Sequence, residues 1–487
     1  MKTTGTWYKE IALCIMVLGS MFGSTGALAE TEKEKELQQK VDMLESRIGQ
    51  LEAVVNSIQA ASPAPPTGGA LPAEVEERLA KLEKTAKKID GKSIMIPKWK
   101  DGLRLTSNDK QYEIKIGGRI HNDWMFAGEE DAIRNAIGEL DDGVEFRRAR
   151  LYLAGHIYKH FDFKMQYDFA DGDADFKDVY MGIRDIPPWG GGLRFGQFKE
   201  PFSFEELTSS NYITFMERSL PNALVPGRST GAMMYQSLCD DRMTWAAGVF
   251  RDSDDFGDRS EDEKGGSGEY NFTGRLTALP IYRNEGRTLL HLGGAISHRN
   301  PNDDMGRYRQ RPEAHLTDRF IDTRTFGSDE VNLYGAEAAL VCGPLSLQAE
   351  YIKADVELND TAKGFPSGDD PEFDGYYVYL SYFLTGEHRR YKKTSGAFAR
   401  VKPNKNFLED GCGPGAVELA ARYSYLDLSD GAIDGGELED WTLGLNWYLN
   451  PNMRFMFNYV RAQVDRAALG LDGEETDIFQ VRAQFDF

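Results

Sequence analysis

The last ten residues of the chain, 478–487, alternate apolar and polar side chains without a break. Successive side chains of a strand point to opposite faces, so this segment predicts a strand with one oily and one wet face. Its apolar face carries Phe479, Val481, Ala483, Phe485 and Phe487. The same alternation recurs over 161–169 and 441–449. Repeated strands of this kind are typical of a sheet that separates lipid from water.

Sixteen such strands are predicted between residue 100 and the last residue. An antiparallel sheet of this size closes into a barrel around an aqueous channel, so the predicted fold class is an all-β transmembrane barrel preceded by an α-helical coiled-coil segment. The candidate strands are 111–126, 144–158, 161–170, 175–185, 192–199, 230–238, 242–252, 268–280, 286–299, 327–342, 344–357, 373–384, 415–428, 438–450, 452–465 and 474–487.

Short turns and long connections separate these strands. Short turns are expected on the periplasmic side of such a barrel and long loops on the outer side. The short turns include 159–160, 342–344 and 449–452. The long connections, expected as outer loops, are 200–229, 253–267, 300–326, 358–372, 385–414 and 466–473.

The N-terminal region predicts export. Lys2 and Lys9 precede an apolar stretch over 11–22, and Ala27-Leu28-Ala29 offers a cleavage site, so residues 1–29 are expected to be a signal peptide. No later stretch approaches eighteen consecutive apolar residues, which leaves a closed barrel as the spanning structure. The terminal Phe487 also resembles the assembly signal of outer-membrane barrels. We therefore expect the outer membrane of a Gram-negative bacterium.

A heptad pattern follows the signal peptide. Its positions are Leu37, Val41, Leu44, Ile48, Leu51, Val55 and Ile58. This pattern predicts a coiled coil over 30–60, with a surface helix as the alternative. The simple packing rule favours a dimer, whereas the segment 47–52 is similar to three-stranded coils, and we favour the trimer. A Pro/Ala/Gly linker over 61–73 and a second short helical segment over 74–99 complete a periplasmic stalk before the barrel domain, 100–487.

Composition agrees with a barrel without proving it. The chain has 50 glycines, 27 phenylalanines and 22 tyrosines but only 41% hydrophobic residues, which a large soluble β protein would also allow. A net charge of −21 argues against nucleic acid as a partner. Cys239, Cys342 and Cys412 remain after processing and show no zinc spacing and no clear disulfide framework, although one pair could form. We expect no cofactor and no metal site.

Two further signals are weaker. Residues 252–263 approximate the spacing of a calcium loop, but Phe256 occupies a ligand position, so a solvated loop is expected. The seven histidines show no serine partner that the sequence can identify, so the protein is not expected to be an enzyme.

Cations recur on the predicted inner face of the strands. Guanidinium groups match the oxygens of phosphate-like anions, although general porins also carry inward cations opposite acids. This pattern therefore leaves anion selectivity open. The inward cations are Lys115, Arg119, Arg148, Arg150, Lys164, Arg184, Arg275, Arg422, Arg454 and Arg482.

Several motifs are similar to one family. They are the runs at 117–120, 145–151, 196–202 with 208–210 and 216–218, 307–313, 383–387 and 445–448. In this order they resemble the phosphate-selective porin O/P family over nearly all of residues 100–487. The resemblance implies a trimeric barrel of sixteen strands with an arginine-lined mouth and a constriction built by an infolded loop.

The resemblance also implies roles for individual arginines. It places Arg119, Arg147, Arg148 and Arg218 at the constriction and Arg307, Arg309 and Arg311 in an external arginine ladder. Alternation adds Arg150 to the channel lining. Strand alternation alone would turn Arg147 outward, a conflict that a β-bulge would remove. Glu206 and Asn211 stand where phosphate-specific members carry lysines.

These observations predict an outer-membrane porin. We expect a homotrimer, held in lipid and lipopolysaccharide, that forms an anion-preferring water-filled channel for passive diffusion of phosphate, polyphosphate or similar small anions. The alternative is a structural anchor whose coiled coil tethers the envelope through peptidoglycan or a periplasmic partner.

Overall fold

The computed structural model describes residues 95–252, 270–301, 304–359 and 370–487. The chain divides into two compact units, Met1–Asp90 and Gly91–Phe487, and every described residue belongs to the second. The predicted signal peptide, coiled coil and linker, and most of the calcium-like loop, lie outside the described residues. Residues 95–99, at the end of the segment expected to be helical, form strand β1.

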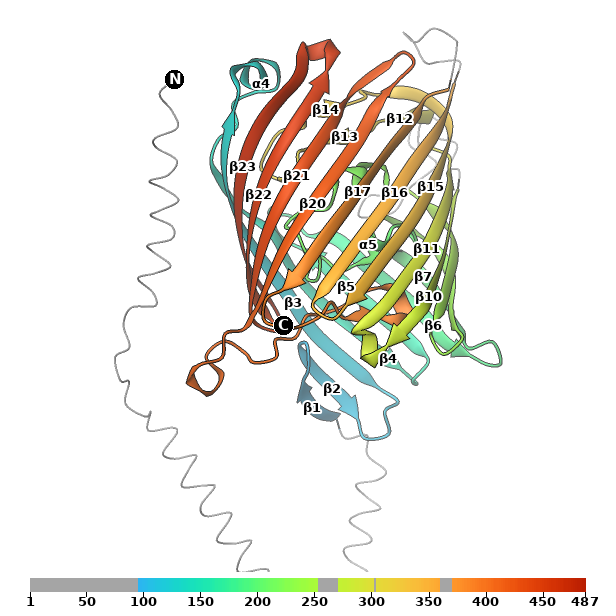
Figure 1. Ribbon diagram of the computed structural model, residues 1–487. Helices are drawn as coiled ribbons and strands as arrows, with labels where there is room; N and C mark the ends of the chain where they lie inside the picture. The colour runs from blue at the N-terminus through green and yellow to red at the C-terminus, as the bar shows by residue number, and fades with distance from the viewer. Residues whose placement is uncertain (1–94, 253–269, 302–303, 360–369) are drawn as a thin grey trace, which may run out of the picture. The chain divides into compact units, whose positions relative to one another are not determined.

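Sixteen of the described strands form a closed antiparallel barrel (Figure 1). Each pairs with its neighbour along the chain, and β23 closes the ring by pairing with β3. The strands are β3 (Glu113–Glu129), β4 (Gly143–Ile157), β5 (Phe161–Asp168), β6 (Asp175–Ile186), β7 (Gly191–Lys199), β8 (Arg228–Leu238), β9 (Met243–Arg251), β10 (Asn271–Arg283), β11 (Thr288–Arg299), β15 (Phe326–Cys342), β16 (Leu345–Leu358), β17 (Glu372–Phe383), β20 (Ala416–Asp430), β21 (Ile433–Asn450), β22 (Met453–Arg466) and β23 (Leu471–Asp486). The predicted fold class is confirmed.

Shorter elements complete the described part of the chain. A hairpin of β1 (Met95–Trp99) and β2 (Leu103–Ser107) extends the sheet beside the start of β3. The remaining strands are β12 (Met305–Gly306), β13 (Arg309–Gln310), β14 (Ile321–Asp322), β18 (Tyr391–Lys392) and β19 (Ala397–Phe398). The helices are α4 (Asp131–Ala136), α5 (Phe204–Leu207), η1 (Leu220–Leu224), η2 (Asn284–Gly286), η4 (Lys393–Ser395), η5 (Glu409–Gly411) and η6 (Ala467–Leu469).

The barrel wall inverts the burial pattern of a soluble protein. On β21 the outward Trp441 and Leu443 are 56% and 54% exposed, whereas the inward Thr442 and Asn446 are fully buried. An oily outer surface around a polar interior is stable only where lipid replaces water outside. The aromatic pair Phe485 and Phe487 lies at one end of the wall, as in the interfacial girdles of membrane barrels, whereas the pair Tyr423 and Trp441 lies about midway along β20 and β21.

The two ends of the barrel differ. One end, here called the turn end, carries the connections 158–160, 187–190, 239–242, 284–287, 343–344, 384–415 and 451–452, together with Phe487. At the other, the loop end, lie 130–142, 169–174, 200–227, 304–325, 431–432 and 467–470, together with the ends of β9, β10, β16 and β17 that flank residues outside the described ranges. The expectation that 385–414 is an outer loop is wrong, because β17 runs toward the turn end and β20 starts there.

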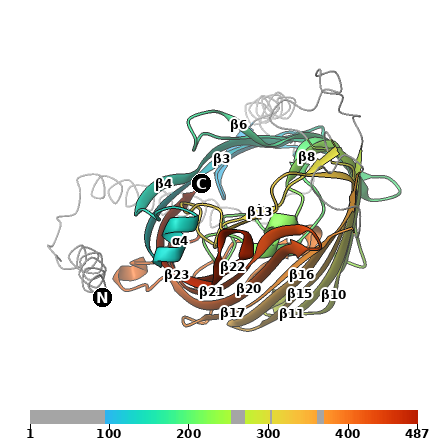
Figure 2. The same cartoon turned by 90° about the horizontal axis from the view of Figure 1, so that it is seen from above.

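Two loop-end connections fold back into the barrel. Loop 200–227 carries α5 and η1, and loop 300–325 carries β13, which lies inside the ring of strands in Figure 2. Their apolar residues join one buried cluster that includes Phe202, Leu220, Phe320 and Ile321. The two loops also touch directly, since the Gln310 side chain donates to the Leu220 carbonyl over 2.9 Å. The lumen is therefore partly filled, and the solvent path is set by these loops.

Candidate functional site

Loop 200–227, here called the infolded loop, is held against the wall by buried arginines. Arg454 donates to the Ile213 carbonyl over 2.9 Å, and Arg422 donates to the Glu217 carbonyl over 3.1 Å. Arg482 donates to the Met216 carbonyl. The loop covers all three side chains, which are almost fully buried. Their predicted inward direction is confirmed, but they anchor the loop and do not face open water.

A first cavity, the outer cavity, lies on the loop-end side of the infolded loop. It has a volume of about 280 Å³, and five arginines contribute to its lining. These are Arg147 from β4, Arg218 from the infolded loop, and Arg309, Arg311 and Arg319 from loop 300–325. The structure thus brings together four of the arginines predicted from the sequence. Arg319 was missed, because no motif or strand alternation marks a single arginine in an irregular loop.

Three of these arginines have no carboxylate partner. Among the described residues, Arg309, Arg311 and Arg319 form no ion pair, although Arg311 donates to the Thr317 carbonyl over 2.6 Å. Glu217 and Glu313 also line the cavity but pair with other arginines, so the three guanidinium groups give the cavity a positive potential. They can exchange hydration water for the oxygens of a small anion.

A β-bulge turns Arg147 into the lumen. His121 on β3 pairs with Arg148, but the next residue, Asn122, pairs with Phe146, so Arg147 is the extra residue of β4. An extra residue breaks the alternation and re-aims the side chain. Arg147 then reaches Glu217 of the infolded loop, with both hydrogen bonds at 3.0 Å. The bulge resolves the conflict over Arg147 in favour of an inward position.

The other predicted constriction arginines, Arg119 and Arg148, and the predicted lining residue Arg150 lie deeper in the wall. Arg119 donates to Ser210 over 2.7 Å, and Arg150 pairs with Asp168 at 2.6 Å. Arg148 is buried beside His121, with its guanidinium 3.9 Å from Glu217. These three residues are grouped behind the infolded loop. Whether they contact a permeating ion stays a prediction.

Arg307 lies apart from the outer cavity. Its guanidinium forms an ion pair with Asp322, and its side chain is 43% exposed. The hydrogen bond from Arg307, aided by its charge, lowers the pKa of Asp322, so the two groups compensate each other. The structure therefore gathers Arg309 and Arg311 of the predicted ladder at the cavity and leaves Arg307 outside its lining.

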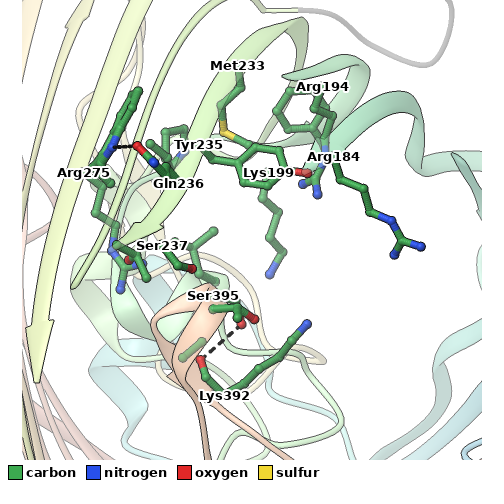
Figure 3. Close-up of a pocket in the computed structure, with 18 of the residues that line it drawn as sticks. Arg184, Arg194, Lys199, Met233, Tyr235, Gln236, Ser237, Arg275, Lys392 and Ser395 are labelled. Atoms are coloured by element: carbon green, nitrogen blue, oxygen red, sulfur yellow. Dashed lines mark hydrogen bonds between the residues drawn. The ribbon is translucent and has the colours of Figure 1, made fainter. Parts of the chain in front are cut away.

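A second cavity, the inner chamber, lies on the turn-end side of the infolded loop (Figure 3). Its volume is about 830 Å³, and its cations are Arg184, Arg194, Lys199, Arg275 and Lys392. Lys199 enters it from β7 and Lys392 from loop 384–415, as Figure 3 shows. Arg194 lies over the Tyr180 ring at 4.2 Å, which keeps its guanidinium edge available to the chamber. Asp162, Asp178, Asp185 and Asp241 also line the chamber.

One carboxylate links the two cavities. Glu206 of α5 lies 2.9 Å from Lys199 of the inner chamber and 3.0 Å from Arg218 of the outer cavity. Burial alone would raise the pKa of Glu206, but the charges of Arg218 and Lys199 outweigh burial and hold the pKa at about 2. The chain Lys199–Glu206–Arg218 therefore spans the junction, with an ionised carboxylate at its centre.

A further polar network lies on the wall opposite the anchored side of the infolded loop. Asp178 of β6 bridges Lys164 at 2.5 Å and Arg228 at 2.7 Å. Arg228 was missed because the predicted strand begins at residue 230, which leaves Arg228 in the predicted connection 200–229, whereas it is the first residue of β8. Lys164 and Arg228 thus share one carboxylate, Asp178, which neutralises their two charges only in part.

Cys239, Cys342 and Cys412 are exposed and unpaired. In residues 95–252, 270–301, 304–359 and 370–487, no group of His, Cys, Asp or Glu side chains is arranged to hold a metal ion. No helix of the described chain is long and apolar enough to cross a membrane.

A sixteen-stranded barrel with an oily exterior, an infolded loop and a charged lumen defines an outer-membrane porin. Residues 114–487 match the phosphate-selective porin O and P family, and the chain belongs to that family. A protein of Caulobacter vibrioides described as uncharacterized is 30% identical over 463 residues, which cover 92% of this chain and 89% of that protein. Porin O of Pseudomonas aeruginosa is 28% identical over 437 residues, 82% of this chain and 93% of that protein.

Solved porins are more distant. The anion-selective porin from Comamonas acidovorans has a TM-score of 0.48 and 11% identity, covering 77% of this chain and all of that one. The outer-membrane channel DcaP of Acinetobacter baumannii has a TM-score of 0.47 and 13% identity, covering 78% of this chain and 99% of that one.

Proposed function

We propose that the protein is an anion-preferring, water-filled channel through which small anions such as phosphate diffuse passively down their gradients. The observation that carries this proposal is the outer cavity, where Arg309, Arg311 and Arg319 have no carboxylate partner among the described residues. A permeating anion regains there the interactions that it loses with water. The name of the family, phosphate-selective porin O and P, supports oxyanions as the substrate class.

The proposed path runs from the outer cavity past the infolded loop into the inner chamber. Cations line both cavities, and Arg119, Arg148 and Arg150 lie close to the wall between them. Short turns mark the periplasmic side of such barrels, so the turn end is placed in the periplasm and the outer cavity faces the exterior. No chemical step and no energy source are part of this function.

We further propose a homotrimer with a periplasmic coiled-coil stalk. The heptad of residues 30–60 favours three strands, and the porin family resemblance implies the same number. Deleting residues 31–90 separates this channel from the alternative, an envelope anchor. The channel function predicts that conductance survives the deletion, whereas the anchor predicts an envelope defect with unchanged transport.

Planar bilayers test the ion preference. Reversal potentials are measured across a KCl gradient for the wild type and for Arg148→Ala and Arg218→Ala. The proposal predicts a chloride preference in the wild type that decreases in the variants, because each change removes a cation near the narrow part of the path. A wild-type channel that prefers potassium would refute the proposed function.

A further inference from the structure

The Glu206 carboxylate has the contacts that a bound anion would have. Its Oε1 lies 2.9 Å from Lys199 Nζ, and its Oε2 lies 3.0 Å from Arg218 Nε. The Glu206 side chain is only 8% exposed, so water screens these contacts poorly. A soluble oxyanion at this junction would need the same two cations. The Glu206 carboxylate therefore competes with a soluble oxyanion for Lys199 and Arg218.

Both cations are held in place independently of the carboxylate. Arg218 donates to the main-chain carbonyls of Glu205, Glu206 and Thr208, each over 3.2 Å. Lys199 also donates to the Glu206 carbonyl. These acceptors belong to the backbone and remain when the side chain changes. The two cations would therefore stay aimed at the same point without the Glu206 charge.

The infolded loop does not depend on Glu206 for its position. Arg422, Arg454 and Arg482 bind its main chain from the wall. Glu350 accepts hydrogen bonds from the backbone N–H groups of Phe204 and Glu205, at 2.8 and 2.7 Å. A purely structural role for Glu206 is thus weakly supported, because the same loop has many other anchors.

We propose that Glu206 is a specificity-determining residue that acts as a tethered anion at the junction of the outer cavity and the inner chamber. Its carboxylate pairs with Lys199 and Arg218, so multiply charged oxyanions bind weakly at the junction. Chloride still passes along the remaining cations of the path. This inference rests on the proposed function. It names a residue that lowers the affinity of the channel for phosphate.

The test is the block of chloride current by added inorganic phosphate or pyrophosphate in planar bilayers. Removing the charge in Glu206→Gln leaves Lys199 and Arg218 without their carboxylate partner, so the concentration that halves the current should fall about tenfold, more for pyrophosphate than for phosphate. Glu205→Gln is the matched control. Glu205 is the preceding residue of α5, but its carboxylate binds Ser219 and Arg422 and pairs with neither Lys199 nor Arg218.

Additional variants protect the test against misfolding. A shift in gel mobility on heating shows that a variant forms a folded barrel. Glu206→Ser is a second variant that lacks the carboxylate, with a shorter side chain than glutamine. In the double variant Glu206→Gln with Arg218→Gln, the gain should vanish, because one of the two cations is gone.

An unchanged block in folded Glu206→Gln and Glu206→Ser channels would overturn the inference, as would an equal gain in Glu205→Gln. These outcomes are distinct from failure of the proposed function. The proposed function fails on the wild-type reversal potential alone, whereas the inference is judged by the difference between variants that conduct.

Discussion

Arg147 and Glu217 form a two-pronged ion pair that joins the barrel wall to the infolded loop. The Nε and Nη2 atoms of Arg147 lie 3.0 Å from the two carboxylate oxygens of Glu217. Glu217 also accepts from Arg482 of β23 at 2.7 Å. Burial alone would raise the pKa of Glu217, but Arg147, Arg148 and Arg482 together hold it well below its usual range. One loop carboxylate therefore joins the second and the last wall strands of the barrel, β4 and β23.

The first prediction concerns this pair. Arg147→Ala should weaken anchoring of the loop by about 1–3 kcal/mol, the usual contribution of hydrogen bonds to a charged group. It should also reduce the chloride preference, because a cation leaves the outer cavity. Urea unfolding in lipid vesicles and reversal potentials measure the two effects. Arg147→Lys is the informative companion, since a lysine keeps the charge but cannot form two parallel hydrogen bonds.

The second prediction separates the three arginines of loop 300–325 that the sequence motif groups together. Arg309→Ala and Arg311→Ala should each lower single-channel conductance at low salt, with a smaller effect at high salt, because screening weakens long-range attraction. Arg307→Ala should change conductance little, since Asp322 already neutralises Arg307. Equal losses in all three variants would mean that the outer cavity is not the path of the ions.

The third prediction concerns pH. Glu206 has a pKa near 2, lowered from its usual 4.5 by Arg218 and Lys199. Its stabilising contribution is fully present above about pH 4.5 and is lost as the pH falls toward 2. The difference in reversal potential between the wild type and Glu206→Gln should therefore persist from pH 7 to about pH 4. A difference that disappears near pH 5 would show that the Lys199–Glu206–Arg218 contacts do not form in the open channel.

The fourth prediction concerns loop 384–415 at the turn end. Arg389 is buried there, donates to the Tyr212 carbonyl of the infolded loop over 2.7 Å and lies 4.7 Å from the Phe398 ring. Arg389→Ala should free this part of the infolded loop and increase current noise in single-channel recordings. Lys402→Ala, an exposed position of the same loop, is the control and should leave the noise unchanged.

Strand alternation predicts the wall well and the lumen only partly. Predicted strand 161–170 is β5, and predicted strand 474–487 is β23 with small shifts of the ends. The pattern succeeds because lipid and water impose a period of two on every strand. It cannot tell whether an inward side chain meets water or protein, so Arg422, Arg454 and Arg482 were expected in the channel lining although the infolded loop covers them.

The other features that the sequence did not predict lie in or beside irregular segments. The length of a connection does not reveal the end of the barrel from which it leaves, which is why 385–414 was placed on the wrong side. Arg319 and Arg228 follow no alternation, since one lies in a loop and the other at the first residue of a strand. Arg147 was placed correctly only because the porin family resemblance outweighed the strand pattern at a bulge.

The barrel closes through its last residue. Phe487 and Gly118 exchange both main-chain hydrogen bonds, at 2.9 and 3.1 Å, where β23 meets the first wall strand. Because this seam joins the first and the last strands of the wall, the bore is sealed only where β23 meets β3, and separating these two strands would open the ring along its length.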